Sequence, residues 1–184
     1  LFHRAAQLYE QAGDPEAAAA AYALDEVSPE SWRRAAALYR SAGRHKDAAP
    51  LYERLASWGD AAQSWEDAGE LAQAAALYRD RLGEPLHAAQ LLEAARLFGA
   101  AASVYEAQGD LERAIDMLRL DPNSRTQRER IRALQRRLLR EGSSAHLQDL
   151  VSAAAGPDER VVLYLEAGEW TRAAQEMVDH DQWQ

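Results

Sequence analysis

A five-fold internal repeat constrains the fold of this chain more than any other feature of its sequence. An aromatic residue is followed by glycine four positions later and by alanine five positions after that. The pattern occurs at Tyr9, Gly13 and Ala18; Tyr39, Gly43 and Ala48; Trp65, Gly69 and Ala74; Tyr105, Gly109 and Ala114; and Tyr164, Gly168 and Ala173. Such self-similarity is typical of stacked repeats, which mostly present surfaces to partner proteins.

The residue composition favours helices throughout the chain. Alanine, the best helix former, accounts for 40 of the 184 residues, and no stretch alternates between apolar and polar residues with a period of two. We therefore predict an all-α fold, a right-handed α-solenoid of antiparallel helix pairs with about 12–13 short helices.

Glycine and proline divide the chain into these helices. Glycine is the usual residue just past a helix end, because it readily adopts the left-handed conformation. Pro50 lies about one turn inside a predicted helix, where it would either kink the helix or mark a later start. Helices are predicted at residues 2–12, 15–24, 30–42, 45–57, 60–68, 71–82, 85–97, 100–108, 111–120, 124–141, 144–155, 158–167 and 170–180.

A second periodicity of 40 residues overlays Gly43 on Gly83 and Trp65 on Tyr105. This unit holds three predicted helices, and an odd number would exchange the two layers of a regular solenoid at each unit. Either one helix is displaced, or the stack twists sharply near residues 82–86.

Residues 1–120 carry the clear repeats, and residues 121–184 are predicted to continue them in degenerate form. Because the sequence begins at Leu1 without methionine, we expect a fragment of a larger protein. The chain has no cysteine, which excludes disulfides and cysteine-ligated metal sites, and no apolar run approaches the about 20 residues of a membrane span. We expect a cytoplasmic protein that does not bind membranes.

The sequence offers little support for catalysis. None of the five histidines forms an i, i+4 pair, and the glycines are spaced as helix caps rather than as a phosphate-binding loop. Residues 179–181 (Asp-His-Asp) could contact a metal, but they are interpreted as solvated surface near a chain end. We expect no catalytic residue, no cofactor and no metal site.

The repeat resembles the tetratricopeptide repeat over residues 2–120, with a partial match at 158–178. The early aromatics of the first helices are Phe2, Trp32, Trp58 and Phe98, and the small residues one turn later are Ala6, Ala36, Ala62 and Ala102. The glycine-to-glycine spacings of 30, 26 and 40 residues depart from the family repeat of about 34. Shorter helical pairs, as in clathrin-like or sensor-protein solenoids, fit as well.

The resemblance implies a partner-binding groove along the first helices, at six, three and two positions before each glycine. It is lined mainly by Gln7, Glu10, Gln11, Arg40, Gln63, Glu66, Asp67, Ser103 and Glu106. Because these residues include more carboxylates than basic groups, the expected ligand is a basic or amphipathic protein segment. The alternative is that they form an ordinary solvated helix face with no ligand. Members of the family that bind a peptide's terminal carboxylate do so through lysine and asparagine on these helices. We do not expect such a clamp here, because Lys46 and Asn123 lie outside the groove positions.

An arginine-rich helix at residues 124–141 is the second candidate surface. It carries seven arginines and two glutamates in a chain whose net charge is −9, and one stripe holds Arg125, Arg128, Arg132, Arg136 and Arg140. The stripe is expected either to pair with the surrounding acidic residues or to dock an acidic protein segment or a nucleic-acid backbone. The acidic charge elsewhere makes nucleic acid the weaker alternative.

The aromatic residues at repeat positions (Trp32, Trp58, Trp65, Tyr39 and Tyr105) are interpreted as core. We therefore expect a non-enzymatic scaffold or sensor module that binds a protein or peptide on its solenoid surface. Docking through the arginine-rich helix and a purely structural spacer arm are the alternatives. Exposed apolar ends leave self-association open.

Overall fold

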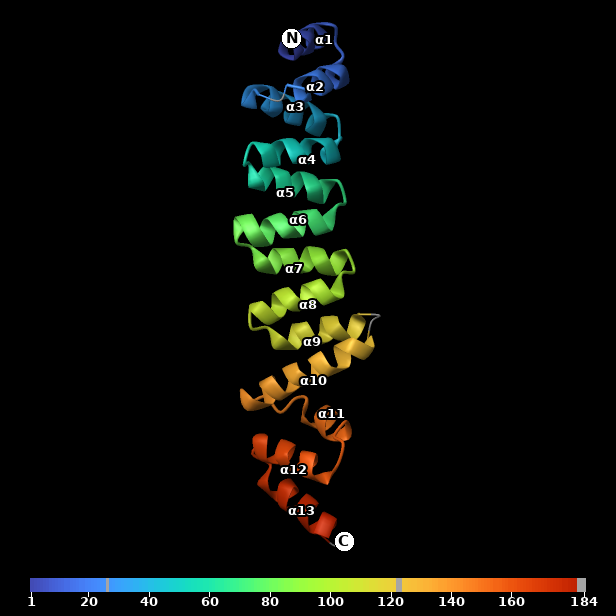
Figure 1. Cartoon of the computed structure of the whole chain (residues 1–184), viewed down its shortest axis with the longest axis vertical. Coiled ribbons are helices and arrows are strands. Elements are labelled where there is room, and N and C mark those ends of the chain that lie inside the picture. The colour runs from blue at the N-terminus through green and yellow to red at the C-terminus, as the bar shows by residue number, and fades with distance from the viewer. Residues whose placement is uncertain (26, 122–123, 182–184) are drawn as a thin grey trace. The chain divides into compact units, whose positions relative to one another are not determined.

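The computed structural model describes residues 1–25, 27–121 and 124–181, with the side chains of 1–25, 27–121 and 127–179. These residues form thirteen α-helices and one π-helix and contain no strand, so the all-α prediction is confirmed (Figure 1). The helices are α1 (Phe2–Gln11), α2 (Pro15–Ala23), α3 (Pro29–Ser41), α4 (His45–Arg54), α5 (Trp58–Asp67), α6 (Leu71–Leu77), the π-helix η1 (Tyr78–Leu82), α7 (Pro85–Ala94), α8 (Phe98–Ala107), α9 (Leu111–Leu120), α10 (Ser124–Arg140), α11 (Leu147–Ser152), α12 (Pro157–Glu166) and α13 (Trp170–Asp181).

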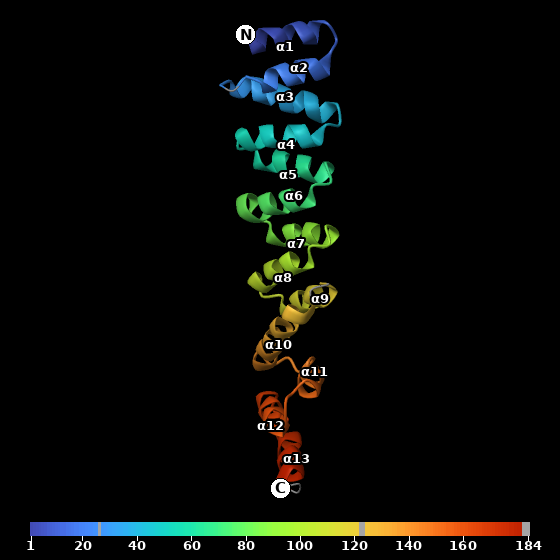
Figure 2. The same cartoon turned by 45° about the vertical axis from the view of Figure 1, so that its right-hand side comes forward.

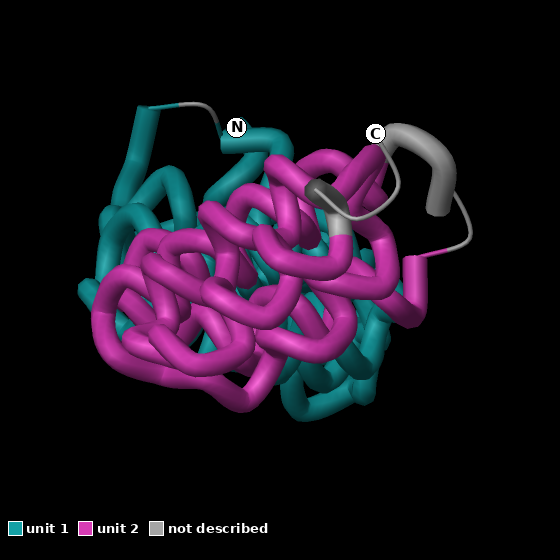
Figure 3. Tube along the Cα trace, turned by 90° about the horizontal axis from the view of Figure 1, so that it is seen from below, with its two compact units in different colours: residues 1–104 teal, residues 105–184 magenta. Residues whose placement is uncertain are grey.

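The chain divides into two compact units, Leu1–Val104 and Tyr105–Gln184 (Figure 3). In the first unit α1 to α6 each pack against the helix that follows in the chain, and both side views display this order (Figures 1 and 2). In the second unit α9 to α13 also pack in chain order. Packing between sequence neighbours is therefore common to both units, and the predicted division at residue 120 stays a description of the sequence pattern.

Small residues bring the helices together at the predicted places. Ala6, Ala36, Ala62 and Ala102 have no exposed surface, and the alanines five positions after each patterned glycine are also buried. The large residue nine positions after the glycine is buried at Tyr22, Tyr52 and Leu118. Small residues thus permit close approach while large ones fill the space that remains, as close packing requires.

The aromatic residues at repeat positions are only partly core. Tyr39 and Tyr105 are buried, whereas the three tryptophans Trp32, Trp58 and Trp65 are half-buried. The guanidinium of Arg54 lies 4.4 Å from the ring centre of Trp32, and that of Arg81 lies 4.7 Å from Trp58. Trp32 and Trp58 are therefore partly buried and also take part in cation–π contacts, whereas the Trp65 indole donates a hydrogen bond to Glu53.

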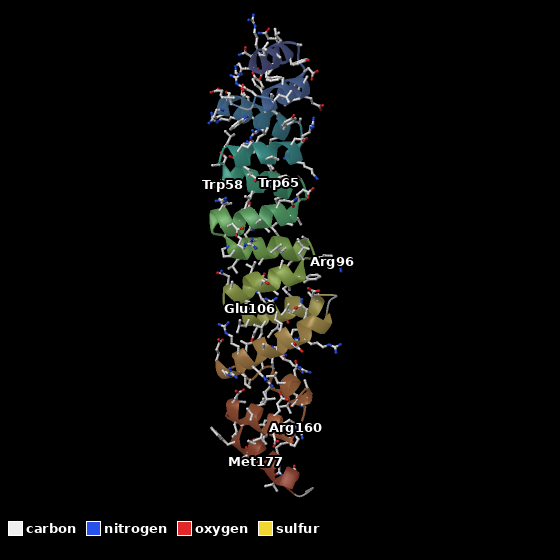
Figure 4. The ribbon with its side chains drawn as sticks, in the orientation of Figure 1. Trp58, Trp65, Arg96, Glu106, Arg160 and Met177 are labelled. Atoms are coloured by element: carbon white, nitrogen blue, oxygen red, sulfur yellow. The ribbon has the colours of Figure 1, made fainter. Side chains whose placement is uncertain are left out.

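Two glycines predicted to end helices lie inside them instead. α5 and α8 begin at Trp58 and Phe98, two residues before the predicted starts, so Gly59 and Gly99 fall in their first turns. The left-handed residues of these turns are Ala56 (φ 54°) and Arg96 (φ 59°, labelled in Figure 4). Each turn still closes as a glycine turn does, because the amide of the following residue donates to a carbonyl five positions back.

Replacing Ala56 or Arg96 by glycine is expected to stabilise the protein. A side chain in the left-handed region costs about 1–2 kcal/mol, and part of the gain is offset by the freedom that glycine adds to the unfolded chain. We expect A56G and R96G each to raise the free energy of unfolding by about 0.5–1 kcal/mol. The measurement is urea denaturation followed by circular dichroism. The matched control is A68G at φ −77°, which is expected to lower stability.

Pro50 lies within α4, which begins at His45 as predicted, so it does not mark a later helix start. Its side chain is exposed, and the helix continues to Arg54. The packed face of α4 is therefore retained on both sides of the proline, through Ala48, Ala49 and Leu51.

The 40-residue unit is accommodated without displacing a helix from the chain order of the first unit. α6 continues into η1, Gly83 turns the chain at φ 69°, and α7 packs against both α6 and η1. The buried residues of α7 (Ala88, Ala89, Leu91 and Leu92) repeat those of α4 with a shift of 40. α7 thus has the burial pattern of α4, which is the second helix of its pair, although α7 directly follows α6, another second helix.

A small polar network joins α3 to the turn before it. The Ser31 hydroxyl donates to a carboxylate oxygen of Asp25 at 2.8 Å, and the Trp32 indole N–H donates to the Asp25 carbonyl at 2.5 Å. His3 lies 3.1 Å from the Ser31 oxygen. The hydrogen bond from Ser31 lowers the pKa of Asp25 below its ordinary value of 3.8.

This lowered pKa gives stability a defined pH dependence. A carboxyl whose pKa is lower in the folded than in the unfolded state stabilises the fold above its unfolded value, and this contribution disappears as the pH falls through the folded value. We expect D25N to be less stable than the parent chain at neutral pH and the difference to vanish in strong acid. Urea midpoints measured from neutral pH to about pH 2 test this, and a difference that is independent of pH would contradict it.

Candidate functional site

The charged residues of the predicted first-helix groove connect successive helix pairs. Glu10 accepts a hydrogen bond from the Tyr22 hydroxyl at 3.0 Å and lies 3.5 Å from the guanidinium of Arg34 on α3. Arg40 occupies the same repeat position and donates to Asp60 on α5 at 3.0 Å. The residue three positions before the glycine therefore reaches from one first helix to the next.

The same position continues this series at Glu66 and Glu106. Glu66 accepts a hydrogen bond from the Tyr78 hydroxyl at 3.4 Å and lies 3.5 Å from the imidazole of His87 on α7. In the second unit Glu106 pairs with Arg130 on α10 at 2.6 Å. α7 thus contacts α5 where a first helix would, although its sequence overlays on α4.

These contacts contribute modestly to stability. Their larger effect is to occupy the groove residues that a ligand would otherwise bind. The side chains are between about a quarter and a half exposed, and an exposed ion pair contributes about 0–1 kcal/mol. Burial of the alanines and tyrosines beneath them therefore dominates the packing. A ligand that used Glu10, Arg40, Glu66 or Glu106 would compete with these internal partners.

The remaining groove residues present mostly amide and hydroxyl groups. Gln63 donates to Asp67 at 3.0 Å, and Asp67 lies 3.7 Å from the imidazole of His45. The other contacts are Gln7 to His3 at 3.2 Å and the Ser103 hydroxyl to the Gly99 carbonyl at 3.0 Å, while Gln11 is exposed. This remaining part of the groove is therefore mainly uncharged and polar, with Asp67 as its carboxylate.

The arginine stripe on α10 divides into paired and unpaired residues. Arg136 pairs with Glu159, and Arg140 lies 3.3 Å from Glu166, both on α12. Arg128 and Arg132 are exposed and form no ion pair with the described side chains. Arg125 lies outside the described side chains. The expectation of pairing with nearby acids thus holds for the end of the stripe, whereas its middle is available.

A shallow groove separates α10 from α12. It has a volume of about 360 Å³ and is lined by Arg136, Arg140, Asp158, Glu159, Val162, Leu163 and Glu166. A second hollow of about 450 Å³ adjoins it and is lined by Glu129, Arg132, Ala133, Arg136, Arg140 and Glu159. The two hollows are therefore lined by the arginines of α10, by four carboxylates (Glu129, Asp158, Glu159 and Glu166) and by the apolar residues Ala133, Val162 and Leu163.

Glu159 is fixed at the centre of these hollows. Its carboxylate accepts a hydrogen bond from the Ala155 amide at 2.8 Å, and that bond, with the charges of Arg136 and Arg132, lowers the pKa of Glu159. The sequence placed Glu159 in the first turn of a helix. It gave no signal that Glu159 contacts Arg136 on α10, because these two residues are 23 positions apart. We call the surface formed by Arg128, Arg132 and these hollows the basic groove.

Across the described part of the chain, no three histidine or carboxylate side chains gather as a metal site requires. The side chains of His180 and Asp181 lie outside the described residues. No helix in the described ranges is both long and apolar enough to cross a membrane.

No protein-family model matches this chain, and no curated protein matches it. Its relation to the tetratricopeptide repeat therefore stays a resemblance of sequence pattern.

Proposed function

We propose that this chain is a non-catalytic α-solenoid module of antiparallel helix pairs that binds an acidic segment of a partner protein in the basic groove. The repeat pattern and the packing of helices in chain order support the solenoid. One observation carries the choice of site: Arg132, which lines one of the two hollows, and Arg128 one helical turn before it are exposed and form no ion pair with described residues. We further propose a cytoplasmic location.

The spacing of the two free arginines defines the ligand. Residues four apart on a helix rise by about 6 Å, and each guanidinium offers a flat fork of donors that suits a carboxylate. Carboxylates two residues apart in an extended segment are separated by about 6.6–6.8 Å and match this spacing. An apolar residue nearby would contact the exposed Val162 at the edge of the groove.

Charge reversal of the free arginines tests this site. We expect R128E/R132E to weaken binding of a fluorescent peptide with alternating glutamate and leucine by about a hundredfold, because each lost charge-assisted hydrogen bond is equivalent to about a tenfold change. Binding is measured by fluorescence anisotropy and is expected to weaken as salt is raised. The matched control is R4E/R33E, which changes the net charge equally at two exposed arginines of the first unit. Equal losses in both variants would contradict a specific site.

The first-helix groove is the second candidate. The last turn of α5 presents Glu66 and Asp67 side by side, with side chains 30% and 41% exposed, which favours a basic or amphipathic segment. E66K/D67K/E106K should abolish binding of a lysine- and leucine-rich peptide if this groove is used. A chain that binds neither peptide would instead favour the spacer arm.

A further inference from the structure

Two acidic side chains of α12 already occupy arginines of the basic groove. Glu159 accepts a hydrogen bond from Arg136 on α10. Glu166 accepts hydrogen bonds from both Nε and Nη2 of Arg140, each at 3.3 Å. The chain therefore places its own carboxylates on two arginines of the stripe, where the carboxylates of an acidic ligand would otherwise bind.

The occupied arginines follow the free ones on the same helix. Arg128 and Arg132 are exposed and form no ion pair with the described side chains. Four residues separate each arginine from the next as far as Arg140, so each lies about 6 Å further along the helix. Arg132, Arg136 and Arg140 line one hollow of about 450 Å³. A segment bound at the free arginines would therefore reach Arg136 next, where it meets Glu159.

Glu159 is held in this position by a second contact. Its carboxylate also accepts a hydrogen bond from the Ala155 amide at 2.8 Å, in the turn before α12. That bond, with the charges of Arg136 and Arg132, lowers the pKa of Glu159 below its ordinary value of 4.5. Glu159 is therefore ionised at neutral pH and repels a ligand carboxylate that approaches Arg136.

The position of α12 does not depend on these two glutamates. Leu163, which lies between them in the sequence, is 2% exposed and belongs to the same core cluster as Leu139 of α10. The side chains of Glu159 and Glu166 are 36% and 26% exposed, and ion pairs with this much exposure contribute little to stability. Replacing both glutamates by glutamine should therefore free the arginines while leaving the fold intact.

We propose that Glu159 and Glu166 close the basic groove at Arg136 and thereby limit the number of carboxylates that it accepts from an acidic segment. This inference rests on the proposed function, because it concerns the same groove and the same class of ligand. A third ligand carboxylate could bind only by replacing Glu159 on Arg136, which exchanges one ion pair for another and gains little affinity. The two glutamates thus determine specificity by selecting short acidic segments over long ones.

Two fluorescent peptides of equal length test the proposal by fluorescence anisotropy at fixed salt. One carries four glutamates at alternate positions, about 6.6–6.8 Å apart in an extended chain, and in the other the last two glutamates are glutamines. We expect the parent chain to bind the two peptides with affinities within about threefold of each other, because Arg136 and Arg140 are occupied and the remaining charge difference is screened.

The variants are expected to distinguish the two peptides in steps. E159Q/E166Q should bind the four-glutamate peptide about a hundredfold more tightly than the two-glutamate peptide, because each further charge-assisted contact is equivalent to about a tenfold change. E159Q alone should show a preference of about tenfold, because Arg140 stays paired with Glu166.

The matched control is E141Q/E169Q. It removes two carboxylates of the same unit whose ion pairs, with Arg137 and Arg172, lie outside both hollows. This variant should distinguish the peptides no better than the parent chain does, and circular dichroism checks that all variants are folded.

A parent chain that already prefers the four-glutamate peptide by about tenfold or more would overturn the closing role of the glutamates. Equal preferences in E159Q/E166Q and in the control would also overturn it, because general charge would then explain the result. In both cases, binding of the two-glutamate peptide that is lost in R128E/R132E would leave the proposed function standing. If neither peptide binds the parent chain or E159Q/E166Q, the proposed function and this inference both fail.

Discussion

Tyr22→Ala is expected to lower the free energy of unfolding by about 3–5 kcal/mol, which is the usual cost of deleting a large buried side chain. Tyr22 has no exposed surface and lies in the core cluster that helices α1 to α5 share. Its ring is 5.4 Å from the ring of His3 and 5.9 Å from the guanidinium of Arg34. Removing it leaves a cavity at the contact between two helix pairs, so both pairs lose packing.

Urea denaturation followed by circular dichroism and by tryptophan fluorescence measures this effect. Tyr22→Phe is the matched control, because it keeps the ring and removes only the hydroxyl that contacts Glu10 and Arg34. We expect it to cost about 0.5–1.5 kcal/mol, since Glu10 and Arg34 remain close enough to pair with each other. A loss below about 1 kcal/mol for Tyr22→Ala would show that Tyr22 does not stabilise the contact.

Ala62→Leu is expected to be the next most damaging change, at about 1–3 kcal/mol. Ala62 has no exposed surface and stands at the position where small residues allow helices to approach closely. Three additional carbon atoms would force α5 away from its neighbours or drive the new side chain from its preferred rotamer.

The control for overpacking is Ala37→Leu, the same substitution at an exposed position of α3. Leucine is nearly as good a helix former as alanine, so we expect a change within about 0.5 kcal/mol. Thermal melts of the two variants should therefore differ clearly, and equal melting temperatures would contradict the packing argument.

The sequence predicted the helices well because their signals are local. Glycine turns, first-turn prolines and the spacing of alanines involve residues within a few positions of one another, and thirteen predicted helices correspond to those in the described residues. The predicted starts of α5 and α8 were two residues late, and the helix predicted at 144–155 is only α11, Leu147–Ser152. Ala56 and Arg96 adopt the left-handed conformation that the pattern assigned to the nearby glycines.

The candidate surfaces were predicted less completely, because they depend on which helix faces meet. Glu10 and Glu66 were predicted to line a groove open to a ligand, yet they accept hydrogen bonds from Tyr22 and Tyr78, twelve residues further along the chain. The basic groove needed Glu159 and Val162 on α12, which no spacing rule connects to α10.

The sequence by itself determined that this chain is helical, where its helices lie and which small residues hold them together, because helix formation follows residues three and four apart. Only the tertiary structure decided which charged residues pair between helix pairs and which stay free. Arg128 and Arg136 belong to one stripe, but only Arg136 meets a carboxylate on α12. That difference comes from packing over 20 or more residues, where burial of apolar surface sets the contact and the charges at its edge follow.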